Sequence, residues 1–406
     1  MTIKSGKILT IGNAFLVDRL QTSGPGNLNI PTEKIYETGN ELAVATLRDV
    51  PDLTYDMESF DVSIETESML TGIPVADWPS LPDGTVIDLG DAKPIDIISP
   101  YKAAGTSKTT VRGVAIPQLT LENTTYRFGV GASATQTYTL RGDAVYFIPG
   151  TPYYQVFTGN GVGPYTLTNT ALRTVEKGDD IFALSVCVMY ADGTYKRLFH
   201  GTDYTDTATA VTIVDAAVAP VDASVRVVYG SATAATFAQA LHPTASVKPA
   251  AVRGKDIDLY VAVDTGVGQT LMRWQGVQSV DITRAVNVEV QDELGNPHHV
   301  TSDYDQPDVT GTITMRPGTV EYLFDRVAQV TNTPTNEIAN LLTSEPLELQ
   351  IRIHHPETGA ALKTLRIPDA RIEPPGPQAR ANQRLEVSMP FSSDSGALEI
   401  IKGLPA

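Results

Sequence analysis

The sequence predicts a mainly β protein that contains two copies of one β-barrel or β-sandwich domain with a flanking helix, and a small inserted β-sandwich. Three observations support this fold class. Apolar and polar residues alternate in many short segments, which is typical of strands with one buried face. A segment near the start recurs near the end. The residues between these copies are unusually rich in Thr, Ala and Val.

The internal repeat is the strongest of these signals, because a repeat determines the architecture of a chain. Residues 33–54 (EKIYETGNELAVATLRDVPDLT) align without a gap with residues 289–310 (EVQDELGNPHHVTSDYDQPDVT), a shift of 256 positions. Glycine and asparagine tolerate positive φ, so the Gly-Asn pair in each copy predicts a turn. The identical residues include Glu33 and Glu289, Glu37 and Glu293, Gly39 and Gly295, Asn40 and Asn296, Asp49 and Asp305, Pro51 and Pro307, Asp52 and Asp308, and Thr54 and Thr310.

The correspondence continues on both sides of these segments. Upstream, residues 20–22 resemble residues 277–279. Three downstream segments also match: KPIDI (93–97) with EPLEL (345–349), IPQLTLE (116–122) with IPDARIE (367–373), and loosely QTYTL (136–140) with QRLEV (383–387). We therefore expect a first domain at residues 1–150, an inserted module at 151–253 and a second domain at 254–406.

The two copies differ in their predicted helices. Alternation predicts strands at SFDVSIE (59–65) and LELQIRI (347–353). Val320, Leu323, Phe324, Val327 and Val330 follow helical spacing after Pro317-Gly318, and a second short helix is predicted from Thr333. Residues 66–91 of the first copy carry several prolines and glycines, so they predict a long loop.

The middle segment predicts a separate β-sandwich. Strand-like runs occur at IFALSVCVMY (181–190), TAVTIV (209–214) and SVRVVYG (224–230), separated by turn signals. The single cysteine, Cys187, lies in the first run and is interpreted as a small buried hydrophobe rather than a nucleophile. One cysteine excludes an intramolecular disulfide framework and is compatible with assembly in a cytoplasm.

Charge and hydropathy exclude several classes of protein. The net charge of −17 repels other polyanions at short range, so we do not expect the protein to coat nucleic acid. The longest apolar run, residues 181–190, is half the ~20 residues that a membrane-spanning helix needs, and no signal-peptide core follows Met1. The sequence therefore predicts no membrane segment.

No motif in the sequence predicts catalysis. The adjacent histidines His298-His299 and His354-His355 would point to opposite faces of a strand, which is unfavourable for binding one metal. GNGVGP (159–164) lacks the lysine of a phosphate-binding loop and reads as a turn. The acidic clusters lack calcium-loop spacing, and no GxSxG, HExxH or CxxC occurs. We predict a non-enzyme with no cofactor and no metal.

The repeated elements resemble a known family. YETGNELAVATLRDVPDLTYDMESFDV in the first copy, and VQSVDITRAVNVEVQDELGNPHHV with QPDVTGTITM in the second, look like siphophage major tail proteins (tail tube proteins) with a duplicated tube domain. The middle segment, especially residues 201–230, is similar to the small Ig-like modules that decorate phage virions. The resemblance implies a structural virion protein whose rings stack into the tail tube that conducts phage DNA.

The resemblance also implies partners and a symmetry. Single-domain subunits of such tubes close rings of six, so a chain with two fused copies would close a homotrimeric, pseudo-sixfold ring. The expected partners are further copies of the chain and the tail tip or baseplate, tape measure and tail terminator proteins, with genomic DNA passing without specific binding. The expected location is the virion tail, assembled in the host cytoplasm.

An acidic lumen would repel DNA phosphates and let the genome slide. Glu58, Asp61, Glu65, Asp281 and Glu289 are the candidate lumenal carboxylates, chosen from their positions on predicted alternating strands, and solvent-facing positions are the alternative for each. Two other functions stay open. The chain could be another virion part built from tube domains, such as a hub, baseplate or neck protein, or a carbohydrate-binding, adhesin-like β-protein whose middle module is the active part.

Overall fold

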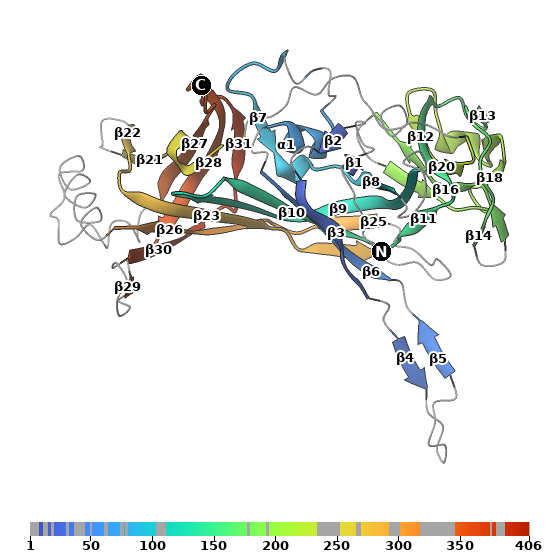
Figure 1. Cartoon of the computed structure of the whole chain (residues 1–406), viewed down its shortest axis with the longest axis horizontal. Helices are drawn as coiled ribbons and strands as arrows, with labels where there is room; N and C mark the ends of the chain where they lie inside the picture. The colour runs from blue at the N-terminus through green and yellow to red at the C-terminus, as the bar shows by residue number, and fades with distance from the viewer. Residues whose placement is uncertain are drawn as a thin grey trace.

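The computed structural model describes most of the chain, in segments separated by gaps (Figure 1). The described residues are 8–10, 15–17, 20–29, 32–35, 45–48, 51–60, 64–73, 77, 80–102, 111–176, 179–191, 195–233, 252–264, 269–291, 301–316, 346–373, 376–378 and 386–405. The fold is mainly β with several antiparallel sheets, which confirms the prediction of a mainly β protein. No described helix is long and apolar enough to cross a membrane.

The strands before residue 150 form what we call unit one. They are β1 (Ile8–Thr10), β2 (Phe15–Val17), β3 (Leu20–Asn29), β4 (Thr32–Ile35), β5 (Ala45–Arg48), β6 (Asp52–Ser59), β7 (Val86–Asp88), β8 (Ile95–Lys102), β9 (Val111–Gly129), β10 (Thr135–Gly142) and β11 (Tyr146–Ile148). Unit one also has helix α1 (Glu65–Leu70) and a 3-10 turn, η2 (Leu89–Asp91).

The strands after residue 253 form unit two. They are β21 (Ile257–Asp264), β22 (Gln269–Arg273), β23 (Val277–Ala285), β24 (Val288–Gln291), β25 (Thr301–Tyr304), β26 (Asp308–Met315), β27 (Leu347–His354), β28 (Ala361–Ile372), β29 (Gly376–Gln378), β30 (Glu386–Ser393) and β31 (Glu399–Lys402). A 3-10 turn, η4 (Gly254–Asp256), precedes them.

The two units share one long antiparallel sheet. Its strands pair in the order β3, β6, β10, β9, β23, β26, β30, β29. The pairing of β9 with β23 joins unit one to unit two, and we call it the seam. Figure 1 shows β10, β23 and β26 running along the molecule beneath α1, β27 and β28.

A second layer covers one face of the long sheet. In unit one it contains β8, β1, β2 and β11, and in unit two it contains β27, β21, β22 and β31. The 19-residue β9 belongs to both layers, because its first half pairs with β8 and its second half with β10. One hydrophobic core, drawn from both units, fills the space between the layers.

Within each of the two units, corresponding strands pair in the same order and in the same register. Thr54 of β6 lies opposite Arg141 of β10, and Thr310 of β26 lies opposite Ser392 of β30. Ile97 lies opposite Ile116, and Leu349 lies opposite Ile367. These partners are related by the shifts of 256 (54 to 310), 252 (97 to 349) and 251 (116 to 367) that align the two copies in sequence. The β4–β5 and β24–β25 hairpins obey the shift of 256 as well.

Bulges in the strand pairing also occur at corresponding positions of the two units. A bulge follows Leu20 in β3 and Val277 in β23, and another follows Ile95 in β8 and Leu347 in β27. The closing strands correct one sequence alignment. Gln136 lies opposite Tyr126, and Val387 lies opposite Pro377. Both residues of the second pair come 251 positions after those of the first, so Gln136 of β10 corresponds to Val387 of β30 and not to Gln383.

The structure contradicts two predictions for unit one. Residues 66–91 are not one long loop, since α1 buries Met69 and Leu70 in the common core and β7 pairs with β31. The predicted strand at 59–65 ends at Ser59, and Ile64 precedes the helix as its N-cap. Helix burial here depends on contacts distant in sequence, which a proline count cannot show. The helices predicted at 320–330 and from Thr333 lie outside the described residues.

The middle module has its own core. One sheet contains β12 (Thr151–Thr158), β20 (Ser224–Ser231), β16 (Ala183–Met189) and β17 (Tyr195–Leu198). A second contains β13 (Tyr165–Thr166), β19 (Ala210–Ile213) and β18 (Tyr204–Thr207), and β14 (Thr174–Glu176) pairs with β15 (Asp179–Ile181). A turn, η3 (Ala216–Val218), follows β19. Side chains from both main sheets share one cluster, as a small β-sandwich requires.

Candidate functional site

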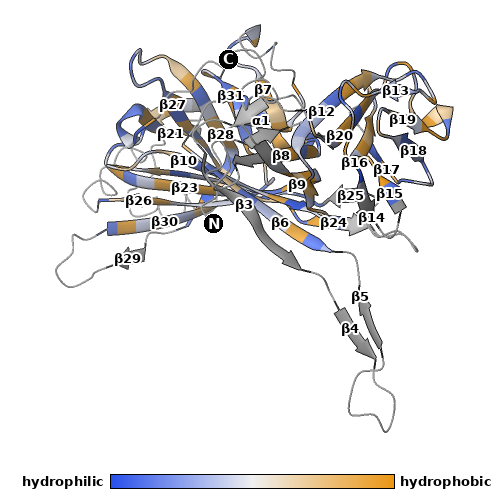
Figure 2. Ribbon diagram, turned by 45° about the vertical axis from the view of Figure 1, so that its right-hand side comes forward, coloured by the Kyte–Doolittle hydropathy of each residue, from blue (hydrophilic) through white to orange (hydrophobic). Residues whose placement is uncertain are grey.

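The exposed face of the long sheet is the most distinctive polar surface of the described structure. Along β6, Leu53, Tyr55 and Met57 point into the core, so Thr54 and Glu58 lie on the opposite face. The same alternation holds along β10, β26 and β30. We call this opposite face the polar face. In Figure 2 the exposed and buried positions alternate in colour along β6 and β30.

Hydroxyl groups dominate the polar face. Thr125, Thr135, Thr137 and Thr139 come from unit one together with Thr54, and unit two supplies a similar row from β23, β26 and β30. The unit two residues are Ser279, Thr283, Thr310, Thr312, Thr314, Ser388 and Ser392. Thr125 and Thr283 touch across the seam, with their hydroxyl oxygens 3.4 Å apart. Short hydroxyl side chains make a polar surface that carries no charge.

Carboxylates outnumber cations on the described part of this face. Its acidic residues are Asp52, Asp56, Glu58, Glu122, Asp281, Asp308, Glu373 and Glu386, and its basic residues are Arg127, Arg141 and Arg371. Arg141 is held by Asp52, with Nε 2.9 Å from Oδ1, and donates to the Val288 carbonyl oxygen at 2.9 Å. The polar face therefore has a net negative charge.

Burial affects two of these carboxyl groups. Burial raises the pKa of Asp281, and Arg127, which lies opposite it at the seam, opposes the rise. Burial also raises the pKa of Glu122. Arg141 opposes that rise, whereas the neighbouring Asp52 and Asp56 add to it. The negative charges on this face are thus close enough to influence one another.

The five predicted lumenal carboxylates do not all lie on this face. Glu58 and Asp281 do, on β6 and β23. Glu289 is exposed on β24, in a separate two-stranded sheet. Glu65 is the first residue of α1, so its assignment to a strand was wrong. Asp61 lies outside the described residues.

The repeat-signature residues are only partly described. Asp52 and Asp308 begin β6 and β26 at equivalent positions of the polar face, each preceded by its proline, Pro51 or Pro307. Gly39, Asn40, Gly295 and Asn296 lie outside the described residues. Sequence reasoning missed Asp52, Asp56, Glu122, Asp308, Glu373 and Glu386 as members of the face. Alternation within DLTYDMES and DVTGTITM was the signal that could have identified Asp56 and Asp308.

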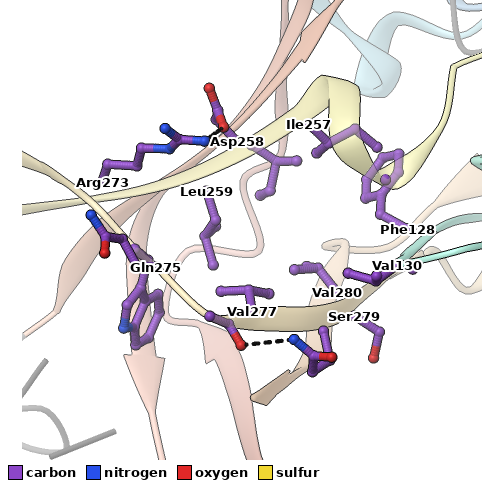
Figure 3. A pocket seen from close by; sticks show the side chains of 16 residues that line it. Phe128, Val130, Ile257, Asp258, Leu259, Arg273, Gln275, Val277, Ser279 and Val280 are labelled. Carbon is purple, nitrogen blue, oxygen red and sulfur yellow. Dashed lines mark hydrogen bonds and ion pairs between the residues drawn. The ribbon is translucent and has the colours of Figure 1, made fainter. Parts of the chain in front are cut away.

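A cavity of about 310 Å³ opens at one end of the seam (Figure 3). Phe128 and Val130 of unit one face Leu259, Val277 and Val280 of unit two across it. Arg273 and Asp258 form an ion pair at its rim. Its walls therefore come from both units and combine apolar and polar groups. Among the described residues, no group of three or more His, Cys, Asp or Glu could hold a metal ion.

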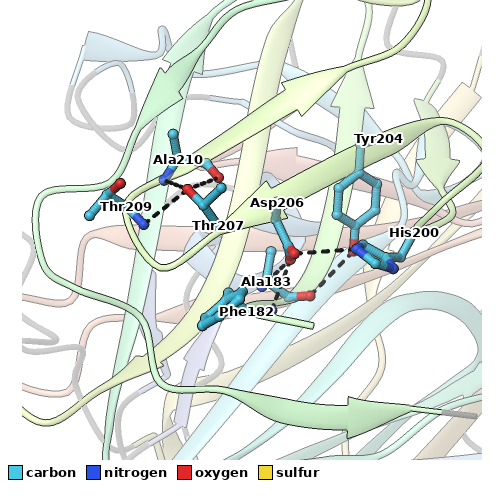
Figure 4. Close-up of polar contacts among 8 residues, drawn as sticks. All are labelled: Phe182, Ala183, His200, Tyr204, Asp206, Thr207, Thr209 and Ala210. Atoms are coloured by element: carbon cyan, nitrogen blue, oxygen red, sulfur yellow. Dashed lines mark hydrogen bonds and ion pairs between the residues drawn. The ribbon is translucent and has the colours of Figure 1, made fainter. Parts of the chain in front are cut away.

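Within the module, the main polar cluster joins its two sheets (Figure 4). The Asp206 carboxylate on β18 accepts hydrogen bonds from the backbone N–H groups of Phe182 at 2.9 Å and Ala183 at 2.7 Å. Tyr204 donates to the Ala183 carbonyl oxygen at 3.2 Å, and His200 Nε2 lies 3.3 Å from Asp206 Oδ1. Since the Asp206 side chain is fully buried, this cluster fixes the module's internal structure.

The module docks on the second layer and not on the polar face. Ile98, Ala115 and Ile148 of unit one pack against the module's Leu184 and Val228. A buried ion pair reinforces this contact, with Arg197 Nη1 2.9 Å from Asp143 Oδ1. Arg197 also donates to the Tyr146 hydroxyl at 2.9 Å.

Cys187 belongs to the same interface. The thiol is buried as predicted, and its Sγ lies 4.0 Å from the buried Asp96 carboxylate of β8. Burial raises the pKa of Cys187, and the nearby Asp96 charge raises it further.

Comparison with known proteins adds no relationship to these observations. No protein-family model matches the chain. No curated protein matches its sequence either.

Proposed function

We propose that this chain is the tail tube protein of a long-tailed phage, a structural virion protein whose trimeric rings stack into a conduit for DNA. The observation that carries the proposal is the seam. Two units with one pairing scheme are joined edge to edge, as neighbouring subunits of a ring would be. The matching registers and bulges support a duplicated domain as the origin of the two units.

Ring closure follows from repeating the seam. Each chain contains one β9–β23 junction, and a head-to-tail contact of the same kind between chains would extend the sheet in one direction. Heterologous contacts of this kind produce closed rings when the rotation per unit divides a full turn. Six units from three chains would give a barrel without free sheet edges, which removes the aggregation risk of exposed edges.

The polar face suits the inner wall of such a barrel. Hydroxyl groups offer DNA no counter-charge, and the excess of carboxylates repels phosphate groups instead of binding them. The docked module leaves this face uncovered, because it packs on β8, β9 and β11 in the other layer. In this arrangement the module projects outward from the tube. The proposed partners are other rings and the tail tip, tape measure and terminator proteins, and the proposed location is the virion tail.

Electron microscopy tests the proposal directly. Purified protein, concentrated and seeded with tail-tip complexes, is expected to form hollow tubes with threefold rings in negative stain. Particles that never stack with or without seeds would contradict the tube function.

A charge variant tests the assignment of the polar face. Asp56→Lys/Glu58→Lys changes each chain by four charges, and tubes built from it should retain double-stranded DNA that wild-type tubes release. Co-sedimentation of DNA with tubes measures this at several salt concentrations. The matched control, Asp215→Lys/Asp222→Lys, makes the same change at exposed module positions. Equal DNA retention by the two variants would show that the polar face does not line the channel.

A further inference from the structure

The two outer edges of the long sheet carry prolines at one equivalent position. Among the described strands, β3 pairs with β6 alone and β29 pairs with β30 alone, so these two strands are the ends of the sheet. Pro25 of β3 lies opposite Tyr55, and Pro377 of β29 lies opposite Val387.

The repeat assigns both prolines to a single pair at the seam. Tyr55 corresponds to Gly311, whose partner on β23 is Ile282, so Pro25 corresponds to Ile282. Val387 corresponds to Gln136, whose partner on β9 is Tyr126, so Pro377 corresponds to Tyr126. Ile282 and Tyr126 lie directly opposite each other in the seam.

That seam pair is one that exchanges backbone hydrogen bonds. Val130 donates its N–H to the Gln278 carbonyl oxygen, and Val286 donates to the Glu122 carbonyl oxygen, both at 2.8 Å. Hydrogen-bonded pairs alternate along an antiparallel ladder, and the register between these two bonds is regular. Ile282 and Tyr126 are therefore a hydrogen-bonded pair, in which each N–H points at the other strand.

Proline has no N–H to offer at such a position. If β29 of one chain pairs with β3 of the next in the seam register, Pro377 meets Pro25 and both bonds of that pair are missing. A bulge between Pro25 and Asn27, absent from the regular part of β23, further perturbs the β3 edge. Prolines and bulges on edge strands are known devices against unwanted strand pairing.

We infer that the chain-to-chain joint is a deliberately weakened copy of the seam, formed by β29 and β3 of a second copy of this chain, with Pro377 opposite Pro25. The inference rests on the proposed ring function and names its contact. The weakened joint keeps free subunits apart until a seeded ring supplies several joints at once.

Restoring the two N–H groups tests the weakening. Pro25→Ala/Pro377→Ala is expected to lower the protein concentration needed for unseeded tube assembly by about ten- to thirtyfold, because two backbone hydrogen bonds are added per joint. Sedimentation of assembled tubes measures this concentration. Pro82→Ala, an exposed proline far from both edges in sequence, is the matched control and should behave as wild type.

Cysteine pairs test the register itself, in a Cys187→Ala background. Gly24 and Gln378 correspond to Asp281 and Arg127, a pair without mutual hydrogen bonds, where the Cα atoms approach most closely. Gly24→Cys/Gln378→Cys should form an interchain disulfide in seeded tubes, and Ser23→Cys/Gln378→Cys, one residue out of register, should not.

The outcomes separate the inference from the proposed function. Two results would overturn the inference and leave the tube function standing. In the first, the wild-type protein forms tubes and the proline variant assembles at the same concentration. In the second, only the shifted cysteine pair forms a cross-link. Irregular aggregates of the proline variant without rings would also overturn it, since the edges would then be guarded against aggregation alone. Absence of tubes for every protein, seeded or not, would reject both.

Discussion

Unit one and unit two hold the same backbone pairing with different side chains. In unit one, Tyr55 and Leu140 are paired across β6 and β10. At the equivalent positions of unit two, Gly311 faces Phe391, and the Phe391 ring occupies the space beside the glycine. The aromatic residue of the pair lies on β6 in unit one and on β30 in unit two, while the register is the same. The combined side-chain volume of the pair is smaller in unit two, so the same register accommodates different packing.

The bulge between β8 and β9 shows a second difference. In unit one, Asp96 accepts a hydrogen bond from the Gln118 N–H at 2.8 Å, and burial against the module raises the pKa of Asp96. In unit two, burial acts on the equivalent Glu348 as well, but hydrogen bonds from Arg366 and Gln350 outweigh it and lower the pKa of Glu348. The two units therefore share a strand register, whereas the carboxylate at the bulge has different surroundings in each unit.

The largest expected effect tests a buried ion pair between the units. Lys363 of β28 lies 2.7 Å from Glu67 of α1, and both side chains are fully buried. Lys363→Ala would leave the Glu67 charge buried and uncompensated, so we expect a loss of about 4 kcal/mol in the free energy of unfolding. Chemical denaturation measures it. Arg371→Ala removes an exposed partner of Asp394 on the same strand and should change little, and equal losses would contradict the explanation.

The next effect concerns the module, which packs against unit one. Arg197→Ala would leave Asp143 buried without its guanidinium partner, and we expect a loss of about 3 kcal/mol from the docked state. Calorimetry should then resolve a separate transition for the module. Arg173→Ala, which breaks an exposed ion pair inside the module, is the control. A single unchanged transition would mean that apolar contacts alone hold the module.

The exchanged packing pair gives a smaller effect. A β-carbon at residue 311 would overlap the Phe391 ring and the Asp281 carbonyl oxygen, so Gly311→Ala should cost about 2 kcal/mol. Adding Phe391→Leu, the unit one residue, should recover part of this loss. Gly129→Ala on β9 would meet only Ala132 at 3.8 Å and should be close to neutral. Thermal denaturation of the three variants checks the order.

The smallest effect is a pH dependence at the seam. The folded-state pKa of Asp281 lies above its ordinary value of 3.8, so its stabilising contribution is present below that value and is lost as pH rises through the folded pKa. Asp281→Asn should therefore raise the denaturation midpoint slightly at pH 7 and leave it unchanged at pH 3. A lower midpoint at pH 7 would show that attraction by Arg127 outweighs burial.

Much of this arrangement was predictable from the amino-acid sequence. Alternation and the repeat shifts predicted a mainly β chain and the strands that correspond, because a side-chain period of two is a local property of a strand. The same alternation also indicates most of the residues that lie on the polar face. Glu58 and Asp281 were placed on it, whereas Glu65 was misplaced because the strand ends before it.

Only the tertiary structure decided how the two units meet. The β9–β23 seam is made by backbone groups, which look alike in every sequence, and Glu67 and Lys363 are 296 residues apart. No local pattern relates such partners, since their pairing depends on how two sheets stack around a common core. The sequence by itself therefore determined the strands and their repeat, and the long-range packing determined which edges joined and which remained free.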